Sequence, residues 1–281
     1  MKKDKFRDPL KKAVFSSIFV ALTGVTVIYS TSLLLKIPIY FRSLLIIFLV
    51  AFAVYNANKK TDKKEDNINY PERTIFIHNN ERLFIYLSII SYVIALIVAF
   101  YFNFWAGLFT LLPFISVILY SSNPIRLKRF FLIKNALVSF TWALFVTCLP
   151  MIFFGNFLFL PALSVFFFIF LKGLGNTIAF DMRDILGDKT YGIKTVPLRY
   201  GIKKSKHILL IINSSSFFLI VVSVYFGVLP NIGYLISLVT FYTYFYIYLI
   251  SKIDLKFLTD ILVDGEFIIM GILALIGILI F

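Results

Sequence analysis

Nine apolar stretches, each long enough to cross a lipid bilayer, follow one another along the 281 residues of this chain. A membrane-spanning helix needs about 20 consecutive apolar residues. Hydrophobic residues make up 60% of the chain and charged residues only 15%, which is not typical of a soluble globular domain. We therefore predict an all-α polytopic membrane protein. Its nine predicted transmembrane helices run roughly over 13–35, 39–56, 83–101, 104–121, 131–153, 157–180, 207–227, 231–250 and 264–281.

The connections between these spans alternate in charge. Every second connection is long and basic, and the tips between them are short and nearly uncharged. Because Lys and Arg accumulate in cytoplasmic loops, we expect the N-terminus and all basic loops in the cytoplasm. The net charge of +14 is explained by lysines and arginines that fix this topology and contact anionic lipid headgroups. We therefore predict membrane lipids as partners and no nucleic acid. The basic loops lie near 57–82, 122–130, 183–206 and 251–263.

The sequence between the spans contains no soluble domain and no linker. We therefore predict a single transmembrane domain over residues 1–281 of an integral protein of the cell membrane. The one cysteine, Cys148, lies inside an apolar run. This excludes a disulfide within the chain and a cysteine-based zinc site.

Two polar clusters lie at the ends of the second and the sixth span. Carboxylates are costly at a bilayer boundary unless they bind something positive. The predicted topology places both clusters on the cytoplasmic face, so we expect them to share one ligand. A diphosphate bridged by Mg²⁺ fits two such sets of oxygens. The clusters contain Asn58, Asp62 and Asp66, and Asp181, Asp184 and Asp188.

The spacing within each cluster matches a helix face. At about 100° per residue, positions 58, 62, 66 and 69 share one face if the helix continues through them. Asp181, Asp184 and Asp188 share a face in the same way. Mg²⁺ prefers octahedral oxygen ligands and usually keeps water and phosphate oxygens among them. Two facing rows of oxygens would therefore hold two or more Mg²⁺ ions around one diphosphate.

A plainer explanation exists for the first cluster. Its lysines can act only as topology determinants, and its acids can form solvated ion pairs with them. This explanation fits the second cluster less well, because Asp181 directly follows the apolar residues 178–180 with no lysine beside it.

Three motifs give the chain its resemblance to a known family, the UbiA superfamily of intramembrane prenyltransferases. These enzymes have nine transmembrane helices and two Asp-rich motifs, roughly NDxxDxxxD and DxxDxxxD. The second motif is matched by DMRDILGDKTYGIKTVPLRYG over 181–201, and the first by NKKTDKKED over 58–66, followed by NINYPER. A third segment, YSSNPIRLKR over 120–129, is similar to the family's YSxxPxRLKR. The resemblance covers essentially the whole chain.

The resemblance implies transfer of a polyprenyl group from its diphosphate to a lipophilic or aromatic acceptor, with release of diphosphate. It also implies helices around a central cavity that opens toward the cytoplasm. Metal ions and basic side chains would neutralise the charge on the leaving group. The expected catalytic residues are Asp62, Asp66, Asp181, Asp184 and Asp188, which with Asn58 would bind Mg²⁺. Arg73, Lys128 and Arg129 are candidates for phosphate contact, and Asn176 for orienting a ligand or for bonding a neighbouring helix.

Lys59 departs from the family pattern, which has Asp at this position. Three interpretations are open. Its ammonium can supply a fixed cation to the diphosphate, it can be a topology charge, or it can mark a paralogue with altered or lost activity. Every other position of the two motifs is kept, so we favour an active enzyme in which Lys59 binds substrate.

Three further charged residues lie within spans. Lys172 is about 180° around its helix from Asp181, so we expect it to snorkel or pack away from the acid clusters. Asp264 and Glu266 stand at the beginning of the ninth predicted span. Two explanations are open: they face the cavity, or they form the acidic start of a helix, which is the plainer explanation.

Two other functional classes remain as alternatives. A membrane transporter or a non-catalytic lipid-binding paralogue can also carry intramembrane acids, although acids halfway along several spans would be more typical of a transporter. A phosphoalcohol transferase is disfavoured because its DGxxAR-type signature is absent. The pattern leaves the acceptor and the prenyl length open; hydroxybenzoate, naphthoate, a prenylated glycerol phosphate, a porphyrin-type ring and other lipids are all compatible with it.

Overall fold

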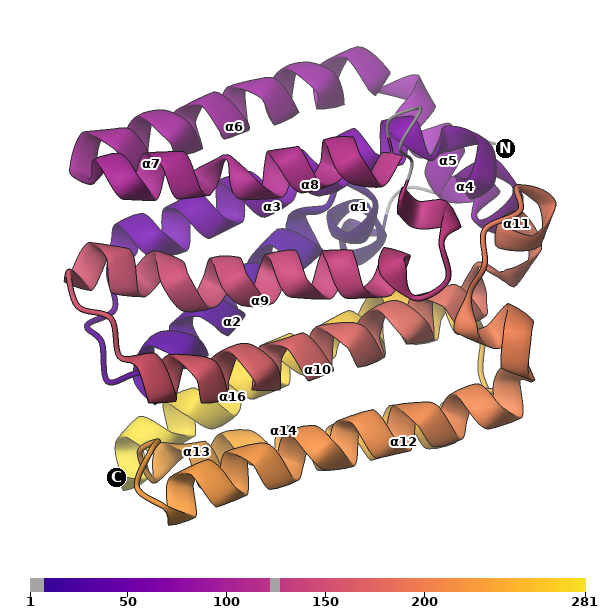
Figure 1. Ribbon diagram of the computed structural model, residues 1–281. Coiled ribbons are helices and arrows are strands. Elements are labelled where there is room, and N and C mark those ends of the chain that lie inside the picture. The colour runs from indigo at the N-terminus through magenta and orange to yellow at the C-terminus, as the bar shows by residue number, and fades with distance from the viewer. Residues whose placement is uncertain (1–7, 122–126) are drawn as a thin grey trace.

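The computed structural model describes residues 8–121 and 127–281, which form helices and no strand. The long helices lie side by side as a bundle (Figure 1). Eight described helices are long and apolar enough to cross a membrane, and a ninth span results when the bent pair α1 (Pro9–Phe15) and α2 (Ile18–Leu34) is counted as one. The predicted all-helical membrane fold is confirmed. Residues 122–126 of the segment 120–129 lie outside the described residues.

Both long and short helices follow along the chain. In chain order they are α3 (Phe41–Thr61), α4 (Lys63–Asn69), α5 (Pro71–Asn79), α6 (Glu81–Phe102), α7 (Phe104–Thr110), α8 (Leu112–Ser121), the 3₁₀ turn η2 (Leu127–Arg129), α9 (Ile133–Phe154), α10 (Phe159–Arg183), α11 (Ile185–Thr190), α12 (Val196–Tyr225), α13 (Ile232–Ser237), α14 (Val239–Leu249), α15 (Leu255–Phe257), the π-helix η3 (Leu258–Val263) and α16 (Asp264–Ile280).

The first predicted span is broken near its beginning. The axes of α1 and α2 differ by 75°, because Ser17 adopts a left-handed backbone with φ of 67°. The break leaves the carbonyls of Phe15 and Ser16 without helical partners. Side chains of α3 replace them: Lys59 Nζ donates to the Phe15 carbonyl at 2.7 Å, and Asn56 Nδ2 donates to the Ser16 carbonyl at 2.9 Å.

The short helices α4, α5 and α11 gather at one end of the bundle, and the C-terminus lies at the opposite end (Figure 1). Phe15 at the end of α1 reaches the same polar end, where its ring packs edge-on against Tyr70 at 5.4 Å between centroids. The helix α1 therefore packs against the elements that carry the first acid cluster.

A fully buried ion pair joins helices in the apolar part of the bundle. Lys172 Nζ of α10 lies 2.7 Å from Glu266 Oε1 of α16, and each residue is only 1% exposed. Lys172 also donates to Asn213 Oδ1 of α12 at 3.0 Å, and Tyr246 of α14 donates to Glu266 Oε2 at 2.8 Å. A buried charge is tolerable only when its partners are in place. Of the two roles expected for Lys172, snorkelling is therefore wrong and packing away from the acid clusters is confirmed, because Glu266 and the hydrogen bonds satisfy the ammonium within the bundle.

Two predicted spans begin later than the observed helices. The seventh begins at Val196 in the structure and passes a non-helical residue, Gly201, with φ of 75° and ψ of 163°. The ninth begins at Leu255 and continues through η3 into α16. Asp264 and Glu266 lie in the first turn of α16, as predicted, but helical structure precedes them, so this turn lies within the span and is not its free end.

The placement of the polar loops at one end of the bundle gives a test of topology. In a Cys148→Ser background, we expect Lys64→Cys and Lys189→Cys to react with a membrane-impermeant maleimide from the cytoplasmic side only. Asn231→Cys, at the opposite tip, should react from outside. All three positions are exposed. Labelling of positions 64 and 189 from opposite faces would contradict a shared polar site.

Candidate active site

Both acid clusters lie at a break between a long helix and a short one. Asp62 separates α3 from α4 with φ of −97° and ψ of 12°, and Asp184 separates α10 from α11 with φ of −95° and ψ of 11°. The assumption that one helix continues through residues 58–69 is therefore wrong. The break ends each long helix at its cluster and lets the short helix leave in a new direction.

The two short helices contact each other directly. The Gly187 amide in α11 donates a hydrogen bond to Asn69 Oδ1 in α4 at 2.7 Å, and both residues are buried. A Cβ atom at position 187 would collide with the Asn69 amide group. Any larger residue at 187 would displace the Asn69 side chain, so this close approach favours glycine and holds the two short helices together.

A cavity of about 240 Å³ lies between the clusters. Eight carboxylates and five cationic side chains line it, so acids exceed cations by three, although the chain as a whole carries a net charge of +14. The carboxylates belong to Asp62, Glu65, Asp66, Asp181, Asp184, Asp188, Asp260 and Asp264, and the cations to Lys59, Arg73, Lys128, Lys134 and Arg183.

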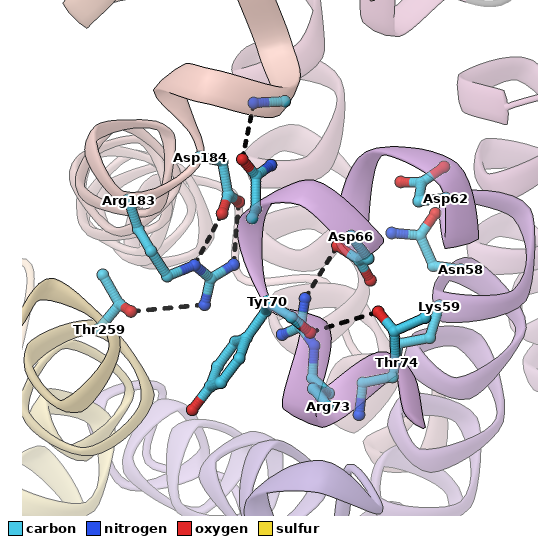
Figure 2. A network of polar contacts seen from close by, with 12 residues as sticks. Asn58, Lys59, Asp62, Asp66, Tyr70, Arg73, Thr74, Arg183, Asp184 and Thr259 are labelled. Atoms are coloured by element: carbon cyan, nitrogen blue, oxygen red, sulfur yellow. Dashed lines mark hydrogen bonds and ion pairs between the residues drawn. The ribbon is translucent and has the colours of Figure 1, made fainter. Parts of the chain in front are cut away.

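The first cluster is held by two cations. Lys128 of η2 is 2% exposed and lies 2.5 Å from Asp62 Oδ1 and 3.1 Å from Glu65 Oε1. Arg73 of α5 donates from Nη2 to Asp66 Oδ1 at 2.9 Å, as Figure 2 shows. The Nε–H of Arg73 is buried and has no partner. This orphan donor is available for a ligand in the cavity.

The second cluster is held by Lys134 and Arg183. Lys134 of α9 lies 2.7 Å from Asp181 Oδ1 and 3.2 Å from Asp188 Oδ2. Arg183 contacts both oxygens of Asp184, at 2.7 and 2.9 Å (Figure 2), and Asp260 Oδ1 of η3 at 2.9 Å. A bidentate pair of this kind fixes the orientation of the carboxylate.

Burial raises the pKa of the carboxyl groups outside the spans, and the neighbouring cations lower it. Burial raises the pKa of Asp188 to about 7, although Lys134 opposes the shift. Burial also raises the pKa of Asp62 against the effect of Lys128. At Asp184 the same burial is outweighed by Arg183, which lowers the pKa. A cation that bound Asp188 near neutral pH would therefore compete with a proton.

The donor set of the cavity fits Mg²⁺ in its chemistry. In the described residues no three His, Cys, Asp or Glu side chains converge on one metal position. Mg²⁺ does not need such a cage, because it is usually bound by one or two carboxylates together with water and phosphate oxygens. Oxygens of this kind line the cavity from α3–α4 on one side and from α10–α11 on the other.

The predicted site residues differ in their placement. All six residues of the two clusters line the cavity, as do Lys59, Arg73, Lys128 and Asn176. Arg129 is exposed and is not among the lining residues. Lys59 Nζ donates to Ser17 Oγ at 2.7 Å as well as to the Phe15 carbonyl, so its ammonium is bonded to the break between α1 and α2.

Several cavity residues were missed from the sequence, chiefly Lys134, Arg183 and Asp260, as was Asn135, which contacts Asp181 from outside the lining. Asp264 lines the cavity, which was the less plain of the two explanations considered for it. Asn135 Nδ2 donates to Asp181 Oδ2 at 2.8 Å. A signal for Lys134 and Asn135 existed: two adjacent polar residues interrupt the start of an apolar span on the face of the acid clusters. Arg183 stood inside the second motif but was not assigned a role.

A smaller apolar pocket of about 80 Å³ shares part of its lining with the polar cavity. Its walls come from α2, α3, α9, α10 and α16, further from the polar end of the bundle. The rings of Tyr55 and Trp142 line both spaces and stack at 5.8 Å with an interplanar angle of 4°. The site thus combines a polar end with an apolar extension.

The sequence is similar to those of known prenyltransferases. Residues 17–257 match the model of the UbiA prenyltransferase family. A digeranylgeranylglyceryl phosphate synthase of Methanosarcina mazei is 30% identical over 223 residues, which are 78% of this chain and 70% of the relative. A synthase of the same name from Sulfurisphaera tokodaii is 30% identical over 70% of this chain and 69% of its own length.

Two solved structures have the same fold. A UbiA homologue from Archaeoglobus fulgidus bound to GPP and Mg²⁺ has a TM-score of 0.68 at 17% identity, covering 96% of this chain and 99% of that one. The apo structure of a UbiA homologue from Aeropyrum pernix K1 has a TM-score of 0.66 at 16% identity, covering 97% and 98%.

The contacts of Lys59 give a prediction about the N-terminal helix. Lys59→Met removes the donor for the Phe15 carbonyl and Ser17, and a hydrogen bond to a charged group contributes about 1.5–3 kcal/mol. We expect hydrogen exchange of the α1 amides to accelerate by roughly tenfold or more. The exposed neighbour Lys60→Met should leave it unchanged. Unchanged exchange in Lys59→Met, together with weaker diphosphate binding, would instead assign Lys59 to the ligand.

Proposed function

Because this chain belongs to the UbiA prenyltransferase family, we propose that it transfers a polyprenyl group from polyprenyl diphosphate to a lipophilic acceptor in a Mg²⁺-dependent reaction that releases diphosphate. One observation carries the proposal: two helix ends with three cluster residues each face one cavity and are joined by the Asn69–Gly187 hydrogen bond. The excess of carboxylates in a basic protein supports a cationic ligand rather than a bare anion.

The two clusters together would bind the Mg²⁺ ions that hold the diphosphate of the donor. When bound, Mg²⁺ neutralises charge on the diphosphate and so favours cleavage of the allylic C–O bond. We assign its binding to Asn58, Asp62, Asp66, Asp181, Asp184 and Asp188, which all line the cavity. The acids would exchange their present lysine and arginine partners for the metal.

The cations released by this exchange would serve the phosphate oxygens. Arg73 is pre-positioned for this, since its Nε–H is an unused donor at the cavity. Lys128 is also a candidate, because its ammonium lies between two acids of the first cluster and can follow a diphosphate that binds there. Arg129 is exposed and has only a peripheral role in this proposal.

The prenyl chain would occupy the apolar pocket that continues from the cavity. Aromatic faces stabilise a cation, and the stacked Tyr55–Trp142 pair lines the junction where the polar space meets the apolar one. For the acceptor, the names of the two synthases favour a prenylated glycerol phosphate. We propose this class as the first acceptor to test, ahead of the aromatic ones.

The basic loops support an orientation with the cavity open to the cytoplasm of a cell membrane. A transporter remains the alternative function, together with a non-catalytic lipid-binding paralogue. The buried Lys172–Glu266 pair is the kind of group that an ion path uses, but its hydrogen bonds to Asn213 and Tyr246 satisfy it within the bundle. The acids that face the cavity lie at helix ends, which favours the enzyme.

Removal of the metal gives the first test of this function. Purified protein is incubated with labelled geranylgeranyl diphosphate and geranylgeranylglyceryl phosphate. We expect product formation to stop in EDTA and to return with Mg²⁺. Asp184→Asn should lower the rate by at least about a hundredfold, since it removes charge from the metal site. Asp254→Asn, an exposed acid outside the cavity, is the matched control. Full activity without metal would contradict the proposed Mg²⁺ site.

The bridge between the clusters gives a second test. Asn69→Ala removes the acceptor for the Gly187 amide, and a net hydrogen bond contributes about 1 kcal/mol. We expect geranylgeranyl diphosphate, measured by filter binding with Mg²⁺, to bind roughly fivefold more weakly. Gly187→Ala should act on the same contact. The double variant should therefore be no weaker than the poorer single one, whereas independent additive losses would separate the two residues.

A further inference from the structure

Asp264 differs from every other carboxylate of the cavity in its partners. Each of the other seven lies within ion-pair distance of a lysine or an arginine. Within the described residues, Asp264 contacts no cation at that distance. It accepts one hydrogen bond, from Asn176 Nδ2 to Oδ1 at 3.1 Å. No hydrogen bond from residues 8–121 or 127–281 reaches its second oxygen, Oδ2, which is available to a ligand.

The backbone places this carboxylate at the junction of the two spaces. Asp264 lines the polar cavity, and its partner Asn176 lines both the cavity and the apolar pocket. Asp264 follows the π-helix η3 directly. Such π-helical turns inside α-helices are rare and occur frequently at functional sites. Here the turn carries Asp260 to Arg183 and, one turn later, Asp264 into the cavity beside Asn176.

We propose that Asp264 is the general base that deprotonates the acceptor. This inference rests on the proposed function and assigns the acceptor to molecules with a nucleophilic hydroxyl group. The hydroxyl oxygen forms a bond to C1 of the prenyl group while the bond from C1 to the diphosphate oxygen breaks. The electron pair of that bond leaves with diphosphate, and the hydroxyl proton passes to Asp264 Oδ2. Asn176 is a positioning residue that holds the carboxylate through Oδ1.

The charge pattern of the cavity explains why this role falls to Asp264. An acid that is bonded to lysine or arginine, or bound to metal, is a weak proton acceptor because its charge is already neutralised. The acids of the two clusters have such partners, and Asp264 does not. Asp264 also lines the same cavity as the stacked Tyr55–Trp142 pair at the junction, where the reactive end of a prenyl chain seated in the apolar pocket would meet the acceptor.

Asp264→Asn tests the proposal by separating donor binding from transfer. The variant keeps the size of the side chain and removes the basic oxygen. Filter binding of labelled geranylgeranyl diphosphate with Mg²⁺ should remain within about twofold of the wild type, because no metal ligand is lost. Transfer to geranylgeranylglyceryl phosphate should fall by about a hundredfold or more, the usual contribution of a general base. Asp254→Asn should match the wild type in both assays.

Three additional variants distinguish a base from a structural residue. Asn176→Ala should lower kcat by about tenfold without weakening the donor, and the Asp264→Asn/Asn176→Ala double variant should be no slower than Asp264→Asn alone. Asp264→Glu, which keeps a basic oxygen, should recover part of the transfer rate. The melting temperature of each variant in detergent reports on folding.

The possible results distinguish failure of the base role of Asp264 from failure of the proposed prenyltransferase function. Normal transfer by a folded Asp264→Asn protein would overturn the role of Asp264 while the proposed function stands. Loss of donor binding in Asp264→Asn, as in a metal-site variant, would make Asp264 a metal ligand and also overturn the role. A wild-type protein that binds donor but transfers to no hydroxyl acceptor would overturn the proposed function itself.

Discussion

Charge compensation at the polar end of the bundle is the constraint on which the site depends. Carboxylates that leave water for a helix boundary lose hydration, and they are retained only when cations and hydrogen bonds replace it. Lys128, Lys134 and Arg183 each contact two carboxylates here. All of these pairs join different elements of the chain except Arg183–Asp184, which are neighbours in the sequence. The same contacts therefore neutralise the acids and hold the helix ends around the cavity. A metal-bound diphosphate brings both kinds of charge and can replace this set.

Helix breaks convert linear motifs into a three-dimensional site. A straight continuation of α3 would carry Asp66 and Asn69 away from α10 and its extension, so the two clusters would share a membrane face without sharing a cavity. The breaks at Asp62 and Asp184 have nearly the same backbone angles. They allow α4 and α11 to meet at the Asn69–Gly187 contact.

The apolar runs and the cluster spacing predicted the fold and six residues that line one cavity, because membrane length and helical period are local properties. Most partners of these residues are not local. Lys134 is typical of the basic residues of a cytoplasmic face, and only packing brings it to Asp181. Arg183 is adjacent to Asp184 in the sequence, but only packing brings it to Asp260. No Gly or Pro near Ser17 predicts the bend, and the hydrogen bonds to its free carbonyls come from side chains of α3. The π-helix that precedes Asp264 has no sequence signature.

Lys59 stands where the first motif of the family has Asp, and the structure gives this lysine a role of its own. An aspartate at this position would add a ninth carboxylate to a cavity where acids already exceed cations by three. It would also leave the Phe15 carbonyl and Ser17 without the ammonium that now bonds both. The lysine therefore removes negative charge from the cavity and closes the break that α1 and α2 require. In this protein the position has become part of the support of the N-terminal helix, while the oxygens of Asn58, Asp62 and Asp66 still line the cavity.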